Sequence, residues 1–171
     1  IRDNLQLDAD DYRVKLRGAS IGEGTVHPGL LMAMDSGMAS GPIDGVAGLE
    51  PAFGLEATWI EPELRHRAEA MNYTVVDPTS VLATHLTELI RQHAPDLLTR
   101  EEVNHLLDEL RKRAPKLVDE TVPGVVKPGE LQKVMQNLLE ERVPVRDLET
   151  ILETLGDWAA HTTVSYTHLT L

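Results

Sequence analysis

Two short strands flanking a helix are predicted by residues 57–76, which read ATWIEPELRHRAEAMNYTVV. Ala57–Ile60 and Tyr73–Val76 are rich in β-branched and aromatic residues, which favour extended backbone. Pro62 suits the first turn of a helix, and Asn72 suits a left-handed cap at its end. Between them, apolar residues recur at helical spacing at Leu64, Ala68 and Met71. This strand–helix–strand unit indicates a mixed fold that contains both strands and helices.

A hairpin and a further strand are predicted upstream of this unit. Apolar and basic residues alternate over Tyr12–Arg17, which is the period of a strand with one wet face, and Ile21–Val26 is the expected return strand. Leu30–Met34 has the composition of a buried strand. Glycine and proline recur at short intervals from Asp35 to Gly48, and this composition predicts a long loop.

Helices are predicted from residue 77 onward. Asp77–Ser80 opens the first of them, Pro95 ends it, and its apolar stripe is expected at Val81, Leu82, Leu86, Leu89, Ile90 and His93. Thr99 with Glu102 forms a capping box for the next helix. Two more helices follow from apolar residues at helical spacing, namely Leu131, Val134, Met135, Leu138 and Leu139, then Leu148, Ile151, Leu152 and Leu155. Residues 97–158 are therefore expected to form a helical bundle or superhelix, which makes the fold class α+β.

Charge and composition exclude several classes of protein. The 171 residues carry 28 acids against 16 bases, a formal net charge of −12. Nucleic-acid binding is not expected, because phosphates require Lys and Arg surfaces, and basic or amphipathic partners fit better. The apolar runs are far shorter than the roughly 20 residues that span a bilayer, so no direct membrane contact is predicted. The absence of cysteine excludes disulfides, thiol nucleophiles and thiolate metal sites.

Motifs for catalysis, metals and cofactors are missing. Ser40 lies between glycines, but Gly37–Gly41 does not have the Gly-x-Ser-x-Gly spacing of a nucleophile elbow. Gly22–Gly24 lacks the third glycine of a dinucleotide site, and no Gly-Lys-Ser/Thr loop occurs. His85 and His93 lie about 80 degrees apart around their helix, and no His-Glu-x-x-His motif occurs. The sequence therefore predicts no enzyme, no catalytic residue, no metal and no cofactor.

Two aromatic residues follow the glycine-rich loop. Trp59 lies in a predicted strand, where a role in the core fits it best. Phe53 lies between Pro51 and Gly54 in an irregular segment. An aromatic side chain at such a position either closes the loop onto the core or stands at a surface pocket, and both alternatives remain open for Phe53.

The chain resembles the FlhA family of flagellar type III protein export components. Blocks that carry this resemblance follow one another in order along the chain: Glu50–Leu55, Trp59–Ile60, Tyr73–Pro78, Ala83–Leu86, Pro115–Val118, Gln136–Leu139 and Arg146–Glu153. The resemblance extends from Ile1 to about Trp158, and the number of separate blocks at fitting intervals makes it specific.

This resemblance implies an integral membrane protein that acts as an export gate. Its large cytoplasmic region would lie at the cytoplasmic face of the bacterial inner membrane, assemble into a nine-membered ring and contact other export-apparatus subunits. Flagellar export chaperone–substrate complexes would dock there before proton-driven secretion. The chaperone-docking site of the family corresponds to Glu50, Phe53 and Thr84 of this chain, with Glu50 at the rim of a hollow.

The resemblance also implies a division into subdomains. Residues 1–28 and 78–96 would form part of one mixed subdomain, and residues 29–77 a smaller α/β subdomain inserted in it. Residues 97–158 would form the helical third subdomain. The remaining residues, 159–171, depart from the family and are expected to be a non-native or disordered tail. Because the chain opens at Ile1 without an initiator Met, a fragment that lacks the membrane part and the last subdomain is expected.

Two other functions stay open. A virulence type III secretion homologue would share this architecture, although the Glu50–Leu55 block favours the flagellar branch. A small acidic hydrolase is a remote alternative, because it would need a nucleophile and a base within reach of each other, and no motif supplies them.

Overall fold

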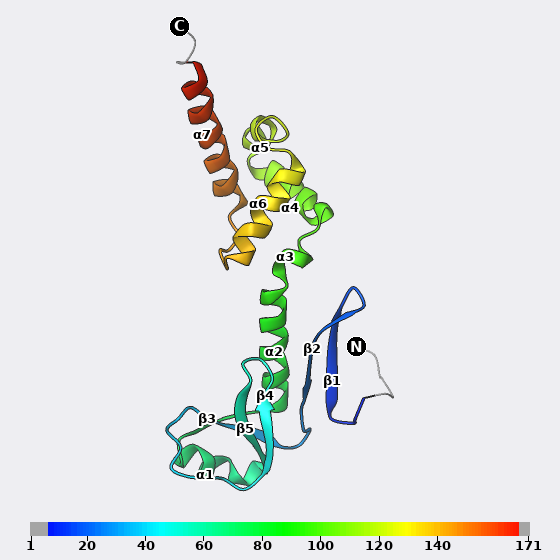
Figure 1. Cartoon of the computed structure of the whole chain (residues 1–171), viewed down its shortest axis with the longest axis vertical. Coiled ribbons are helices and arrows are strands. Elements are labelled where there is room, and N and C mark those ends of the chain that lie inside the picture. Colours follow the sequence, from blue (N-terminus) through cyan, green and yellow to red (C-terminus); the bar gives the residue numbers. More distant parts are fainter. Residues whose placement is uncertain (1–6, 168–171) are drawn as a thin grey trace. The chain divides into compact units, whose positions relative to one another are not determined.

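The computed structural model describes residues 7–167, and for residues 162–167 it describes the backbone alone. The chain divides into two compact units, Ile1–Ile90 and Arg91–Leu171. Figure 1 shows the strands gathered in the first unit, whereas the described elements of the second unit are all helices. The α+β class with a helical second half is therefore confirmed, while the finer division into subdomains stays a prediction.

The first unit begins with a two-stranded hairpin. Strands β1 (Asp11–Leu16) and β2 (Ala19–Thr25) pair antiparallel, with an irregularity between Val14 and Lys15. The two turn residues have positive φ angles, 50° at Arg17 and 90° at Gly18, as two-residue hairpin turns require. The hairpin predicted from alternating residues is thus present.

A four-stranded antiparallel sheet forms the centre of the first unit. Its spatial order is β4 (Val46–Glu50), β5 (Leu55–Ile60), β3 (Leu31–Asp35) and β6 (Tyr73–Val76). Between β5 and β6 run the one-turn helix η1 (Pro62–Leu64) and helix α1 (Arg65–Ala70). Asn72 follows them with a φ of 68°. The strand–helix–strand unit and its left-handed residue are therefore as predicted.

Strand β4 corrects the expectation of a continuous loop up to Gly48. Residues 46–50 pair with β5 in a register that sets Gly48 opposite Ala57. A Cβ atom at Gly48 would lie 3.1 Å from the indole of Trp59, so a glycine leaves room for that large side chain on the sheet. The glycine that reads as a loop signal is here a packing requirement within a strand.

Each face of the sheet packs against one helix. On the first face, Ala68 of α1 packs on Leu31, Ala33 and Ile60. On the second face, Val81 of helix α2 (Pro78–Gln92) packs against a cluster that contains Met32, Ala57 and Trp59. Trp59 is 2% exposed, which confirms its predicted role in the core.

The buried face of α2 differs from the predicted stripe. Val81 and Leu89 are buried as expected, together with the polar residues His85 and Glu88. Three expected members of the stripe are exposed instead, namely Leu82, Leu86 and Ile90. A pattern of apolar residues does not by itself distinguish the covered side of a helix from an uncovered apolar side, which explains this error.

The second unit is a group of helices around one core. It contains α3 (Ala94–Leu97), α4 (Arg100–Arg113), α5 (Pro115–Thr121), α6 (Pro128–Glu140) and α7 (Leu148–Thr167). The core consists of Val103, Leu107, Leu110, Val118, Val122, Val126, Leu131, Met135, Leu148 and Leu152. The hydroxyl of Thr99 accepts from the N–H of Glu102 at 3.2 Å, so the predicted cap of α4 is present.

In this unit only Ala114 separates α4 from α5, and α7 runs to the last described residue, Thr167. Pro115 is the first residue of α5, a position in the first turn of a helix that suits proline. Residues 159–167 continue α7 in the backbone, and residues 168–171 lie outside the described residues. The non-native or disordered nature of the tail from residue 159 stays a prediction.

We expect backbone amides after residue 97 to exchange hydrogen more slowly than those before it in the isolated chain. The helical unit has one core of ten buried apolar residues, whereas the first unit has two clusters of four. Amides that open only with a large core are the best protected. Hydrogen exchange followed by mass spectrometry would measure this, and uniform protection along the chain would contradict it.

Candidate functional site

The turn between β4 and β5 presents Phe53 to solvent. Both carboxylate oxygens of Glu50 accept hydrogen bonds inside this turn, one from the N–H of Ala52 at 3.0 Å and one from the N–H of Phe53 at 2.8 Å. The N–H of Gly54 donates to the Glu50 carbonyl at 2.8 Å. Phe53 itself is 63% exposed, so it does not close the loop onto the core. An aromatic side chain is thus held outside the fold by a hydrogen-bonded turn.

Glu50 lies inside the protein and not at an open rim. Its exposed fraction is 4%, and burying a carboxylate is costly unless hydrogen bonds compensate it. The two N–H groups of the turn supply those bonds, and hydrogen bonds to an ionised group are stronger than neutral ones. Glu50 therefore fixes the conformation in which Phe53 is presented.

A polar contact joins β1 to α2 beside this turn. The hydroxyl of Tyr12 and Nδ1 of His85 lie 2.6 Å apart, and the two rings meet edge to face with centroids 5.7 Å apart. Burial, followed by the negative charge of Glu50, raises the pKa of Tyr12 to about 12. Burial also lowers the pKa of His85, and the negative charge of Glu50 partly offsets this decrease. The Glu50 carboxylate is therefore close enough to influence both rings.

Thr84 is exposed on α2, directly before His85 in the chain. A Cβ atom at Gly24 would lie 2.7 Å from the Tyr12 hydroxyl and 3.0 Å from Pro51, and the same hydroxyl lies 2.6 Å from His85, so the end of β4 and this part of α2 are neighbours. The structure thus brings the segments that carry Glu50, Phe53 and Thr84 into one region, with Phe53 and Thr84 exposed and Glu50 buried.

The sequence did not reveal Tyr12 and His85 as parts of this region. The sequence places Tyr12 in a hairpin strand, and it draws attention to His85 only as a metal ligand that its spacing from His93 does not support. They are 73 residues apart, and the contact between them depends on how β1 packs on α2. The one available signal was a histidine four residues after Val81 on the same helix face, which periodicity places near the core.

A hollow of about 440 Å³ opens beside the turn. Strand β2 lines one side of it, and β4 with Pro51 and Gly54 lines the other. A Cβ atom at Gly24 would lie 2.7 Å from the Tyr12 hydroxyl and 3.0 Å from Pro51, so the two sides approach closely at this glycine. The turn that presents Phe53 is therefore also one wall of a hollow.

This arrangement suits binding to a partner. Within residues 7–161, no three His, Asp or Glu side chains converge in a way that could hold a metal ion. The turn instead offers an exposed aromatic side chain on a hydrogen-bonded backbone beside a hollow, and aromatic side chains serve as anchors in protein interfaces. None of the described helices is both long enough and apolar enough to span a membrane.

Comparisons with known proteins agree with this fold. The model of the FHIPEP family matches residues 1–170. The flagellar biosynthesis protein FlhA of Escherichia coli K12 is 48% identical over 159 residues, which are 93% of this chain and 23% of that protein. The chain therefore spans about a quarter of the length of the curated relatives it matches.

Solved structures are similar in fold at low sequence identity. The CdsV protein of Chlamydia pneumoniae is 22% identical with a TM-score of 0.79, covering 92% of this chain and 46% of that one. CdsV has also been solved in complex with CdsO. Nonameric SctV-C of enteropathogenic E. coli is 22% identical with a TM-score of 0.65, covering 92% of this chain and 48% of that one. These likenesses support the fold alone.

Proposed function

The chain belongs to the FHIPEP family, and from this premise we propose that it is part of the cytoplasmic region of a flagellar type III export gate. In this proposal, chaperone–substrate complexes dock on the region before proton-driven secretion during flagellum assembly. The region would lie at the cytoplasmic face of the inner membrane, attached to the membrane part of a longer protein. It would bind partners and not catalyse a reaction.

The observation that carries the proposal is the exposed Phe53 on a rigid turn. A large aromatic ring that is 63% exposed offers apolar area that a partner can bury. The turn is already ordered by the Glu50 carboxylate, so a partner would lose little conformational entropy in binding it. The docking site is proposed to consist of Phe53 as the anchor, Glu50 as the residue that positions it, and Thr84 on the neighbouring helix.

Assembly and further partners are part of the same proposal. The nonameric form of SctV-C supports a ring built from copies of the complete protein, and the complex of CdsV with CdsO supports contacts with other export-apparatus subunits. Identity of 48% to a flagellar relative, against 22% to the CdsV and SctV-C structures, favours the flagellar branch over a virulence type III secretion homologue.

Calorimetric titration tests the proposal. A complete cytoplasmic region that contains this chain would be titrated with flagellar chaperone–substrate complexes, and with the chaperones and the substrates separately. Saturable binding of the complexes is the expected result. If the complexes bind no more tightly than an unrelated acidic protein does, docking on this region is wrong.

We expect Glu50→Ala to weaken docking by about tenfold, because it removes two charge-assisted hydrogen bonds that order the turn. A loss of about 1.5 kcal/mol corresponds to this factor. Glu50→Gln keeps one acceptor oxygen and should have a smaller effect. Glu63→Ala removes an exposed acid elsewhere and serves as the control for charge.

Salt dependence separates positioning from charge steering in this experiment. Because both oxygens of Glu50 are used inside the turn, the Glu50→Ala variant should lose affinity to a similar degree at low and high salt. A defect that disappears at high salt would contradict the positioning role, since screening removes steering by exposed charges.

A further inference from the structure

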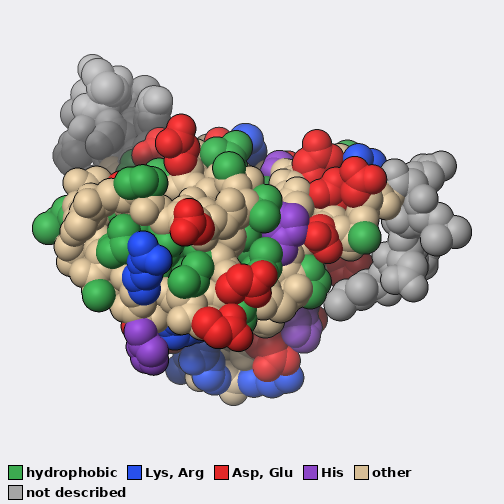
Figure 2. All heavy atoms as spheres, turned by 90° about the horizontal axis from the view of Figure 1, so that it is seen from below, with side chains coloured by type: hydrophobic (Ala, Val, Ile, Leu, Met, Phe, Trp, Pro, Cys, Tyr) green, Lys and Arg blue, Asp and Glu red, His purple; other side chains and the backbone are tan. Residues whose placement is uncertain are grey.

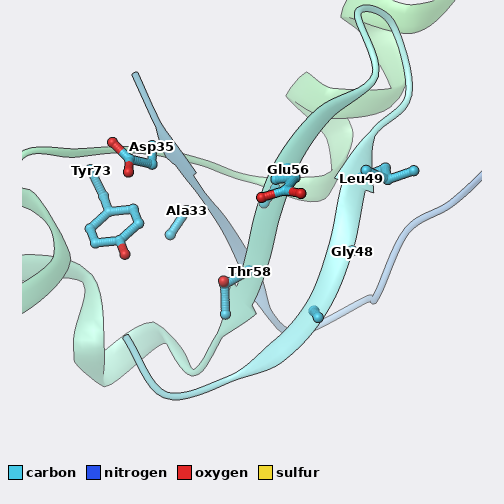
Figure 3. A pocket seen from close by; sticks show the side chains of 9 residues that line it. Ala33, Asp35, Gly48, Leu49, Glu56, Thr58 and Tyr73 are labelled. Carbon is cyan, nitrogen blue, oxygen red and sulfur yellow. The ribbon is translucent and has the colours of Figure 1, made fainter. Parts of the chain in front are cut away.

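The face of the sheet that α1 covers is only partly covered. Helix α1 packs near one end of the strands, over Leu31 and Ile60. Toward the other end of β3 and β5, the same face carries an open hollow of about 610 Å³ (Figure 3). This hollow is lined by residues of β3, β4, β5 and β6. Leu49 and Glu56 of its lining adjoin the ends of the turn between β4 and β5, whereas Phe53 is not part of the lining.

Small side chains form the floor of the hollow, and larger side chains form its sides. Ala33 and Ala47 contribute only methyl groups to the lining. Figure 3 shows Tyr73 at one side and Leu49 at the other, with Ala33 and Thr58 between them. The Tyr73 hydroxyl donates to the Gly41 carbonyl at 2.8 Å, which holds the ring in place, and Leu49 is 61% exposed.

The charged residues that line the hollow, Asp35 and Glu56, are both acids. Three backbone N–H groups, those of Ala39, Gly37 and Met38, donate to Oδ1 of Asp35 and lower its pKa, so this residue is ionised at neutral pH. The side chain of Glu56 has no hydrogen-bond or ion-pair partner among the described residues. The lining of the hollow therefore contains two carboxylates and the small apolar residues Ala33 and Ala47, but no Lys, Arg or His.

We propose that this hollow binds an arginine side chain of a protein partner. The two carboxylates can accept hydrogen bonds from a guanidinium, whose five donors are arranged in a planar fork. The arginine stem would lie over Ala33 and Ala47, and the guanidinium can contact the Tyr73 ring as a cation–π pair. An apolar residue next to the arginine would cover Leu49.

Other occupants fit the hollow less well. A divalent metal would need more ligands than two separated carboxylates, and no group of three metal-binding side chains occurs in the described part of the chain. Nucleic acids and acidic proteins would be repelled by these carboxylates and by the net charge of −12. Figure 2 shows acidic side chains on one face of the molecule, interspersed with apolar side chains and with some Lys, Arg and His side chains. The net charge of −12 still favours basic and amphipathic partners.

Nuclear magnetic resonance with a small probe tests this proposal directly. The full chain labelled with ¹⁵N would be titrated with the capped tripeptide Leu-Arg-Leu, and with the same peptide carrying citrulline in place of arginine. Citrulline has nearly the same shape without the charge. We expect saturable shifts at Asp35, Glu56 and Tyr73, and at least fivefold weaker binding of the citrulline peptide.

Variants of the chain complete the test. Glu56→Lys should weaken binding of the arginine peptide at least tenfold, whereas Glu63→Lys, with the same charge change at an exposed position outside the hollow, should change it less than twofold. Phe53→Ala should have no effect, which keeps this proposal independent of the docking site. The proposal is wrong if the citrulline peptide binds equally well, if Glu63→Lys acts like Glu56→Lys, or if the shifts gather outside the hollow.

Discussion

Replacement of Phe53 by alanine is expected to weaken the binding of chaperone–substrate complexes at least roughly thirtyfold. Aromatic anchors buried at the centre of an interface commonly contribute about 2 kcal/mol or more, and each 1.4 kcal/mol corresponds to a factor of ten. The side chain is 63% exposed and belongs to none of the three core clusters. Its removal should therefore leave folding intact, so that a loss of affinity reports on docking.

The titration of the Phe53→Ala variant needs a matched control. Leu106, an exposed apolar residue of α4, can be truncated to alanine in the same way. Circular dichroism would verify that both variants keep the helix content and the melting temperature of the parent. If the Phe53 variant binds like the parent, or if the Leu106 variant loses as much affinity, the anchor role of Phe53 is contradicted.

Replacement of Thr84 by methionine is expected to abolish docking in the same titration. Thr84 is exposed on α2, so a longer side chain at this position meets no buried atoms, and methionine has a higher helix propensity than threonine. In the proposed docking site, the added side chain would occupy space that a partner needs. Folding should therefore be unchanged or slightly more stable.

The neighbouring residue of α2 provides the control for this variant. Ala83 is also exposed, and it points about 100 degrees away from Thr84 around the helix. Ala83→Met adds the same side chain on the same helix and should leave docking unchanged. Normal binding by the Thr84→Met variant would remove Thr84 from the site, and equal losses in both variants would indicate a general effect on α2.

Much of the fold could be predicted from local sequence. The strands Leu55–Ile60 and Tyr73–Val76, the left-handed Asn72 and the cap at Thr99 follow from residues that are adjacent in the chain. In these segments, propensity, capping and periodicity favour the same structure, and tertiary packing did not alter it.

Strand β4 could not be predicted, because its decisive contact is long-range. A Cβ atom at Gly48 would lie only 3.1 Å from the Trp59 indole, and this neighbour is known only when β4 and β5 are paired. The exposed side of α2 at Leu86 and the contact of Tyr12 with His85 have the same origin. Each depends on which elements pack together.

The candidate site was reached from the sequence only in part. The family resemblance supplied Glu50, Phe53 and Thr84. It did not reveal that Glu50 is buried whereas Phe53 and Thr84 are exposed. The local spacing of Glu50 and Phe53 is compatible with a carboxylate that bonds to the next turn, although the burial of Glu50 depends on tertiary packing that the local sequence does not reveal. For Phe53 the sequence left a core role and a surface role open, and its 63% exposure decides for the surface.

Site-specific photocrosslinking tests the central claim, that chaperone–substrate complexes dock on the Phe53 turn, most directly. A photoreactive phenylalanine would replace Phe53 in the complete cytoplasmic region, and in a second variant it would replace Leu106. After irradiation with a chaperone–substrate complex, we expect a covalent product from position 53 and none from position 106. A product from position 106 alone, or equal products from both positions, would contradict docking at this turn.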